Sequence, residues 1–152
     1  MSNRTISTEE ALAILKAGSH GVMSTASAQG EPYGVPVNYC YSETENCIFF
    51  HCARKGKKLD NILQNPRASF VVIGQQAVVP DRFITHYESA LVTGRAALVT
   101  DRDEIVEKLI ALCDRFAPGQ SRRDAVIEKY LPAVAIVKVT VDAITGKRNR
   151  DE

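Results

Sequence analysis

The chain has 152 residues, 45% hydrophobic and 24% charged, and a net charge of +1. This length and composition predict one globular domain, 1–152, with its own hydrophobic core. The balanced charge gives no reason to expect nucleic acid or an anionic membrane as a partner, no apolar run is long enough to cross a bilayer, and the first residues do not resemble a secretory signal. The four cysteines form no C-x-x-C pair, which favours free thiols in a reducing cytoplasm over a zinc site.

The N-terminal part of the chain predicts a helix followed by a β-hairpin. Ser7 and Glu10 have the spacing of a capping box, and apolar residues at helical spacing then predict a helix over about 7–17. Residues 21–26 and 33–41, joined by a turn at 29–32, have the pattern of a hairpin. Pro36 cannot donate a backbone hydrogen bond, so its strand is either an edge strand or carries a bulge. A plain edge strand is the simpler interpretation, whereas a break would free backbone groups for a ligand.

A basic turn follows the third predicted strand. The apolar run from Cys47 ends at His51, and the next residues include Arg54, Lys55, Lys57 and Lys58, interrupted only by Gly56. Apolar residues at helical spacing then predict a helix that ends at 65–66. The start of a helix offers unpaired N–H groups and the positive end of a dipole, and the cations supply full charge. The pattern therefore predicts a phosphate-binding turn, with a solvated basic turn as the alternative.

The C-terminal half continues the β-rich pattern. We expect a strand over 68–74, a loop over 75–82, a long strand over 83–100 with a bend or bulge at Gly94, and a helix over 101–116. Ser121 and Asp124 are expected to cap a short helix that ends at Tyr130; a last strand over 133–141 and a frayed polar tail over 145–152 follow. About six mostly antiparallel strands interrupted by helices predict a mainly β (α+β) fold, a small barrel with helices on its outside.

Common catalytic and nucleotide-binding fingerprints are missing from the sequence. There is no G-x-G-x-x-G, Walker A, G-x-S-x-G or H-E-x-x-H pattern. His51 and His86 lie at strand ends, but a lone histidine is more often structural than catalytic. From the residues alone, the prediction is a β-barrel with an anion site.

The order of these pieces resembles the flavin-binding split-barrel family of the pyridoxamine 5′-phosphate oxidase type, and within it the branch of nitroimidazole-resistance proteins. The resemblance covers nearly the whole chain and is carried by Gly21–Thr25, Gly30–Tyr39, Phe50–Lys58, Asn65–Phe70, Tyr87–Ala96 and Ile144–Lys147. No single motif is decisive, but the set in this order is fairly specific.

The resemblance implies a split-barrel homodimer with flavin mononucleotide (FMN) in two grooves between the subunits. By position, Arg54, Lys55 and Lys58 would hold the phosphate, and Val35, Pro36, Val37 and Asn38 would face the isoalloxazine through backbone groups. Tyr87 and Ser89 of the second subunit would contribute to the same groove. His51 matches a histidine of the nitroimidazole branch, which makes it the candidate catalytic proton donor; the alternative is a structural core histidine.

The chemistry that the resemblance implies is that of an FMN-dependent oxidoreductase. Electrons from a reduced nicotinamide or another donor would pass to a nitroaromatic acceptor. The vitamin-making oxidases of this family bind pyridoxamine phosphate through a set of arginine and histidine residues. The closing segment of this chain has no match to that set, so vitamin B6 oxidation is the less favoured reaction. Alternatives are a non-catalytic flavin-binding module, or a barrel that binds deazaflavin or haem, with His51 as the haem ligand.

Overall fold

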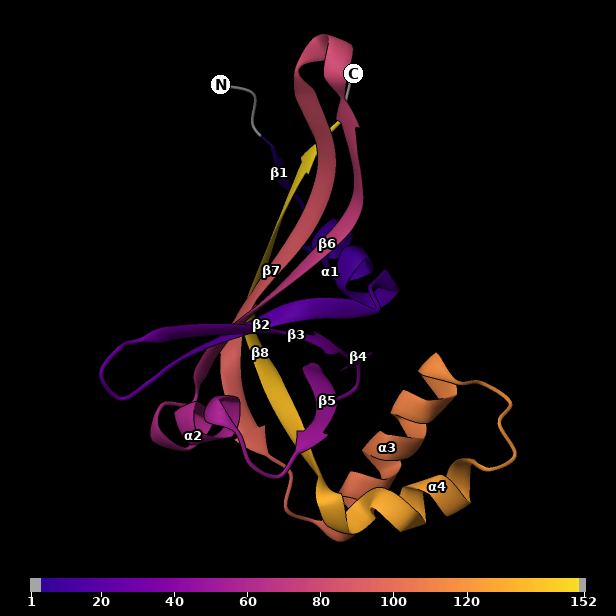
Figure 1. The fold of residues 1–152 in the computed structure, drawn as a ribbon. Coiled ribbons are helices and arrows are strands. Elements are labelled where there is room, and N and C mark those ends of the chain that lie inside the picture. The colour runs from indigo at the N-terminus through magenta and orange to yellow at the C-terminus, as the bar shows by residue number, and fades with distance from the viewer. Residues whose placement is uncertain (1–3, 151–152) are drawn as a thin grey trace.

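The computed structural model describes residues 4–150, which form one strongly curved, eight-stranded antiparallel sheet with helices on its outside (Figure 1). The strands follow the order β3-β2-β6-β7-β8-β5-β4, and β1 pairs with β8. In chain order the elements are β1 (Thr5–Ile6), α1 (Thr8–Ala17), β2 (His20–Ala26), β3 (Pro32–Asn38), β4 (Cys40–Ser42), β5 (Cys47–Ala53), α2 (Lys57–Gln64), β6 (Arg67–Val79), the 3-10 turn η1 (Pro80–Arg82), β7 (Ile84–Leu98), α3 (Arg102–Phe116), α4 (Arg123–Tyr130), the 3-10 turn η2 (Leu131–Ala133) and β8 (Val134–Asn149).

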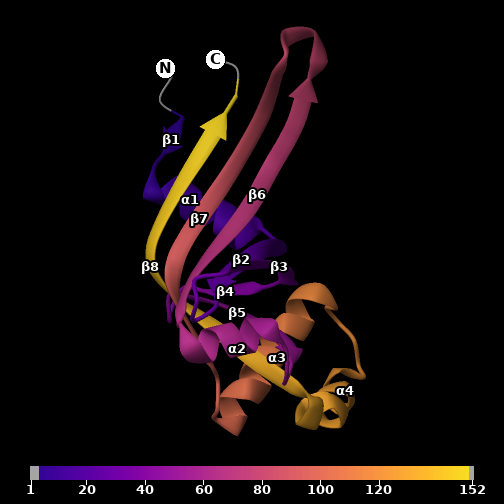
Figure 2. The same ribbon diagram turned by 60° about the vertical axis from the view of Figure 1, so that its left-hand side comes forward.

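Three long strands run through both parts of the molecule, a half-barrel and a projecting arm. β6, β7 and β8 have 13, 15 and 16 residues, and a strand of 15 residues spans roughly 50 Å. Their far ends leave the half-barrel together and form an arm, which consists of residues 73–91 and 145–149 (Figures 1 and 2). α1 lies beside this arm, whereas α2, α3 and α4 lie at the opposite end of the molecule.

Strand β5 explains how the core is divided. Neighbouring side chains of a strand point to opposite faces, and Cys47, Ile48, Phe49 and Phe50 are all buried because both faces are covered. Ile48 and Phe50 belong to the main core inside the barrel. Cys47 and Phe49 belong to a second core that α3 and α4 cover. A strand that is covered on both faces needs apolar side chains at consecutive positions, so its sequence does not alternate between apolar and polar residues.

Several sequence-based predictions are confirmed. The capping box of α1 is present: the N–H of Glu10 donates to Ser7 Oγ at 3.2 Å, and the N–H of Ser7 donates to Glu10 Oε2 at 2.9 Å. Pro36 lies on β3, which is an edge of the sheet, and the β2–β3 register is continuous there, so the edge interpretation is correct. The register shifts at Gly94, where an added Cβ would collide with the carbonyl of Thr140.

The predicted ends of the long strands are wrong. The loop expected over 75–82 is mostly strand, because β6 continues through Val79 opposite β7. The last strand was expected over 133–141, but β8 continues to Asn149, and the residues of the expected frayed tail up to Asn149 pair with β7. Asp151 and Glu152 lie outside the described residues. The residues at these strand ends are largely polar, so their sequence gives little indication of a strand. Pairing with the neighbouring strands determines how far each strand extends.

The remaining differences concern the break in the second hairpin strand and the cap of α4. The strand expected over 33–41 divides at Tyr39, whose buried hydroxyl donates to the carbonyl of Leu15 at 2.5 Å; burial raises the pKa of Tyr39 to about 12. The N-cap of α4 is Arg122 without a side-chain hydrogen bond, so neither Ser121 nor Asp124 caps this helix. The two-residue strand β1 was not predicted. No helix within residues 4–150 is long and apolar enough to span a membrane.

Candidate functional site

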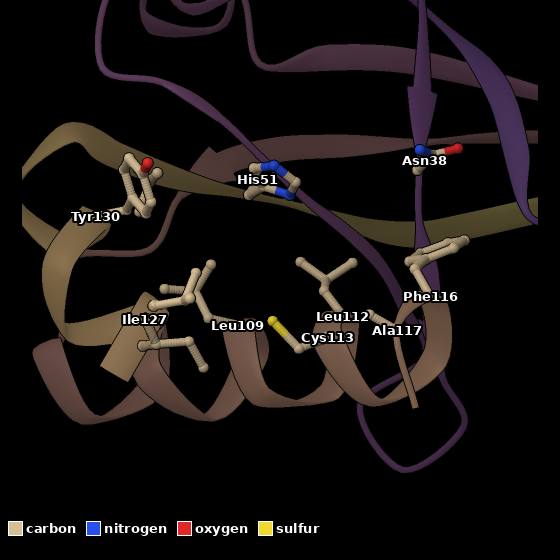
Figure 3. Close-up of a pocket in the computed structure, with 11 residues that line it drawn as sticks. Asn38, His51, Leu109, Leu112, Cys113, Phe116, Ala117, Ile127 and Tyr130 are labelled. Atoms are coloured by element: carbon tan, nitrogen blue, oxygen red, sulfur yellow. The ribbon is translucent and has the colours of Figure 1, made fainter. Parts of the chain in front are cut away.

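A cavity of about 400 Å³ lies between β5 and the facing sides of α3 and α4 (Figure 3). The alternation that directs Cys47 and Phe49 toward α3 also directs His51 away from the barrel interior, and its side chain is exposed. We call this cavity the α3–α4 pocket. It is lined by Asn38, His51, Leu109, Leu112, Cys113, Phe116, Ala117, Val126, Ile127, Tyr130 and Val134.

Helix α3 supplies one wall of the pocket. Leu109, Leu112, Cys113 and Phe116 follow the i, i+3, i+4, i+7 spacing and therefore share one face of the helix. Figure 3 shows these side chains directed toward His51 and Asn38 on the opposite wall. The sequence predicted the helix over 101–116 but not its role in a site, because helical periodicity does not say what an apolar face packs against.

Arg54, the first residue after β5, is bonded to the backbone beyond α4. Its Nε donates to the carbonyl of Val134 and its Nη2 donates to the carbonyl of Leu131, both at 3.2 Å. These bonds tie the end of β5 to η2 and to the start of β8. The guanidinium predicted to hold a phosphate is therefore occupied by backbone carbonyls in this geometry.

The other cations of the basic turn differ in their partners. Lys57 Nζ lies 3.3 Å from Glu31 Oε1 and 5.2 Å from the centre of the Tyr33 ring. Within residues 4–150, neither Lys55 nor Lys58 makes an ion pair or a side-chain hydrogen bond, so both can accept an external anion.

The backbone of the turn also suits an anion. Gly56 is the N-cap of α2 with φ of +154°, a value that favours glycine, and it supplies no side-chain cap. The amides of Leu59 and Asp60 bond to the carbonyl of Gly56. Because no side chain caps this helix start, its first N–H groups remain available to a ligand.

The predicted flavin-facing segment of β3 has two sides. Val35 and Val37 pack against the main core, whereas Pro36 and Asn38 are exposed on the other side. Since Pro36 lacks an N–H and β3 is an edge strand, backbone groups on its free side have no partner strand within residues 4–150. Asn38 also lines the α3–α4 pocket, which brings it to the same cavity as His51.

Tyr87 and Ser89 are not brought to this site within one chain. Tyr87 pairs with Gln76 and Asn149, and Ser89 pairs with Ile73 and Lys147. Both lie on the arm, which Figures 1 and 2 show at the opposite end from α3 and α4. Tyr87 lines a separate open hollow of about 450 Å³ with Gln75, Gln76, Ala77, His86 and Arg150.

The cysteines do not form a metal site or a disulfide in the described residues. All four are free thiols, and burial raises the pKa of Cys40, Cys47 and Cys52. No group of three or more His, Cys, Asp or Glu side chains within residues 4–150 is placed to hold a metal ion.

Comparison with known proteins identifies relatives of the whole chain. The sequence model of the pyridoxamine 5′-phosphate oxidase family matches residues 7–148. No curated protein matches the chain. A candidate 5-nitroimidazole antibiotic resistance protein from Bacteroides thetaiotaomicron has a similar structure, with a TM-score of 0.76, 21% identity, and coverage of 95% of this chain and 86% of that one.

Two further structures show the same fold. An FAD-binding protein from Mesorhizobium loti has a TM-score of 0.70 and 23% identity, and the match covers 97% of this chain and 98% of that one. An FAD and haem binding protein from Mycobacterium smegmatis has a TM-score of 0.79 and 19% identity, with coverage of 98% and 75%. At these identities the likeness establishes the split-barrel fold and leaves the ligand to be argued from the site.

Proposed function

The chain belongs to the pyridoxamine 5′-phosphate oxidase family, and we propose that it is an FMN-dependent oxidoreductase that reduces small nitroaromatic compounds as a cytoplasmic homodimer. The observation that carries this proposal is the basic turn. Lys55 and Lys58 have no anionic partner within residues 4–150 and stand beside the uncapped start of α2. A phosphate monoester fits this combination of two unpaired cations and free backbone N–H groups.

Each remaining predicted site residue has a role in the proposal. The free edge of β3 from Val35 to Asn38 would offer backbone groups to the ring system of the flavin. Arg54 would reach the phosphate only by releasing the carbonyls of Leu131 and Val134, so we assign the main phosphate contacts to Lys55 and Lys58.

Bound FMN would supply two-electron redox chemistry. With a reduced nicotinamide as donor, the first net reaction is ArNO₂ + NADH + H⁺ → ArNO + NAD⁺ + H₂O. His51, exposed beside a cavity, would hold a proton next to the acceptor oxygen. Helices α3 and α4 would limit the access of water to this place.

The proposed homodimer explains the position of the arm. Tyr87 and Ser89 are remote from His51 in their own chain, so they can contribute to its site only from a second copy. An exposed apolar surface is present for such a contact: Val22 on β2 and Leu91 on β7 lie on either side of Val71, and Val22 and Leu91 are 41% and 42% exposed. An interface across this surface would bury it.

A haem-binding function is the second candidate. It is favoured by the exposure of His51 beside an apolar cavity, which suits an axial ligand, and by the similar fold of a protein that binds FAD and haem.

The visible absorption spectrum of the purified protein tests these proposals, together with mass identification of any group released on denaturation. We expect flavin bands and released FMN. Oxidation of NADH that depends on added nitrobenzene would then identify an enzyme. A Soret band would support haem instead, and bound FMN without nitrobenzene-dependent turnover would indicate a non-catalytic flavin-binding module.

A further inference from the structure

We infer that the α3–α4 pocket binds an uncharged aromatic molecule of one or two rings, and that His51 and Asn38 hold its polar substituent. The identification of this molecule as the electron acceptor rests on the proposed function, whereas its binding rests on the pocket itself. Four observations carry the inference.

The first observation is size and shape. A cavity of about 400 Å³ falls in the range of small-molecule sites, roughly 300–1,000 Å³. Its walls come from separate elements, with the strands on one side and the α3 and α4 helices on the other (Figure 3). A ligand that enters this space would contact mostly apolar side chains of the helices on one face, and Asn38, His51 and Val134 of the strands on the other.

The second observation is the chemistry of the walls. None of the eleven lining residues, all of them described, is Asp, Glu, Lys or Arg. The guanidinium of Arg54, three residues after His51, is directed to two backbone carbonyls. Arg115 and Lys129 lie over the rings of Phe116 and Tyr130, at 5.7 and 5.3 Å from the ring centres, but neither cation lines the pocket. An ionised ligand inside the pocket would therefore lose water without a lining side chain of opposite charge, so the pocket favours neutral molecules. The rings of Phe116 and Tyr130 and the sulfur of Cys113 favour an aromatic ligand among these.

The third observation is the polar pair. His51 from β5 and Asn38 from β3 lie on the same wall, opposite α3 (Figure 3). Within residues 4–150 neither side chain makes a hydrogen bond. Together they offer both donors and an acceptor, which suits a nitro or carbonyl oxygen or a ring nitrogen.

The fourth observation is the exposed apolar rim. Phe116, Val126 and Tyr130 are 40%, 36% and 51% exposed, and all three line this pocket. These side chains stay in contact with water when the pocket is empty. A ligand that covered them would remove this apolar surface from solvent, which favours binding.

Two probes and a matched pair of variants test the inference. Nitrobenzene and 4-nitrobenzoate share the nitro group and differ in charge, and binding of each is measured by NMR titration on flavin-free and FMN-loaded protein. Ala117 lies in the pocket wall directly after the last residue of α3, Ala111 lies on α3 outside the pocket, and both are exposed. Ala117→Phe therefore adds bulk inside the pocket, and Ala111→Phe adds the same bulk outside.

We expect the parent protein to bind nitrobenzene at least about tenfold more tightly than 4-nitrobenzoate. Ala117→Phe should weaken nitrobenzene binding by about tenfold, while Ala111→Phe stays within about twofold of the parent. Melting temperatures identify any variant that does not fold. Cys113→Phe, which adds bulk at the centre of the α3 wall, is the second blocking variant.

The outcomes separate this inference from the proposed function. Equal nitrobenzene binding by the folded blocking and control variants would overturn the inference, even for a protein that turns over with FMN. So would equal affinity for the two probes. Blocked nitrobenzene binding in a protein that holds no flavin would support the pocket and overturn the oxidoreductase proposal.

Discussion

His51 occupies an outward position near the end of β5, shortly before the basic turn, and it is exposed rather than buried in the core. A side chain in this position contributes little to packing, because it displaces little apolar surface from water. Its removal should therefore affect chemistry more than folding.

We predict that His51→Ala changes the melting temperature only slightly and keeps FMN bound, while nitroaromatic turnover per bound flavin falls by about 100-fold, as expected for loss of a general acid. The measurements are thermal unfolding, FMN titration and NADH oxidation with nitrobenzene. A large fall in melting temperature with normal turnover would show that the histidine is structural.

Lys55 and Lys58 are the cations of the turn that have neither an ion-pair partner nor a side-chain hydrogen bond in the described chain. We predict that replacing both with Ala weakens FMN binding by tens-fold or more, since each charge-assisted contact contributes about 1.5–3 kcal/mol. Riboflavin, which lacks the phosphate, should bind the double variant nearly as well as the parent. Fluorescence titration of both flavins measures the difference.

Lys57→Ala is the control for that prediction, because Lys57 lies in the same turn but is directed to Glu31 and Tyr33. Its effect on FMN affinity should be clearly smaller. If the double variant and Lys57→Ala lose the same affinity, the turn acts only through its net charge, and specific phosphate contacts are ruled out.

At the scale of elements, helix α3 is held to the sheet by a network of four charges. Glu45, in the turn between β4 and β5, contacts Lys108 of α3 and Lys138 of β8, and Lys138 also contacts Glu104 of α3 at 2.8 Å. Lys108 is almost fully buried and lies 4.9 Å from the centre of the Phe49 ring. The network thus fixes the helix that forms one wall of the α3–α4 pocket.

This network predicts a loss of stability in acid. Hydrogen bonds from Lys108 and Lys138 lower the pKa of Glu45 from its ordinary value of 4.5. The unfolded chain therefore binds this proton more readily than the folded chain. The stabilisation is fully present above pH 4.5 and is lost as the pH falls through the lower pKa of the folded state.

We predict that Glu45→Gln lowers the free energy of unfolding at pH 7 and flattens its decline below pH 4.5. Urea denaturation at a series of pH values measures both effects. Glu43→Gln in the same turn removes an exposed pair with Lys16 and should have little effect at either pH. Parallel pH profiles for the parent and Glu45→Gln would mean that Glu45 does not couple α3 to the sheet.

At the scale of the whole molecule, the arm and the α3–α4 end of one chain are too far apart to share a site. A homodimer in which the arm of one copy approaches the other would bring Tyr87 and Ser89 to the basic turn. The exposed apolar surface at Val22 and Leu91 is the candidate contact.

We predict that Leu91→Glu produces monomers and loses FMN together, because a buried, unpaired carboxylate opposes association. Leu63→Glu makes the same change at a side chain of α2 that is 72% exposed and should leave both properties intact. Light scattering and the flavin content of the purified protein are the measurements. Fully bound FMN on a monomeric parent protein would exclude the shared site.

The sequence by itself determined those features that depend on near neighbours. The capping box of α1, the doubly buried run of β5, the glycine-containing basic turn and the irregularity at Gly94 are set by backbone hydrogen bonds, side-chain alternation and steric limits within a few residues. Family resemblance then identified the barrel. These signals were sufficient to place His51 and the lysines on adjoining parts of one segment.

Only the tertiary structure decided which surfaces meet. β8 pairs with both β5 and β7 across long stretches of sequence, so the lengths of the arm strands follow from their partners rather than from their own polar residues. Arg54 is directed to Leu131 and Val134, which lie 77 and 80 positions further along the chain. The apolar face of α3 becomes a pocket wall because packing places it opposite His51. Long-range contacts of this kind leave no local pattern, since periodicity records only that a face is buried and not what buries it.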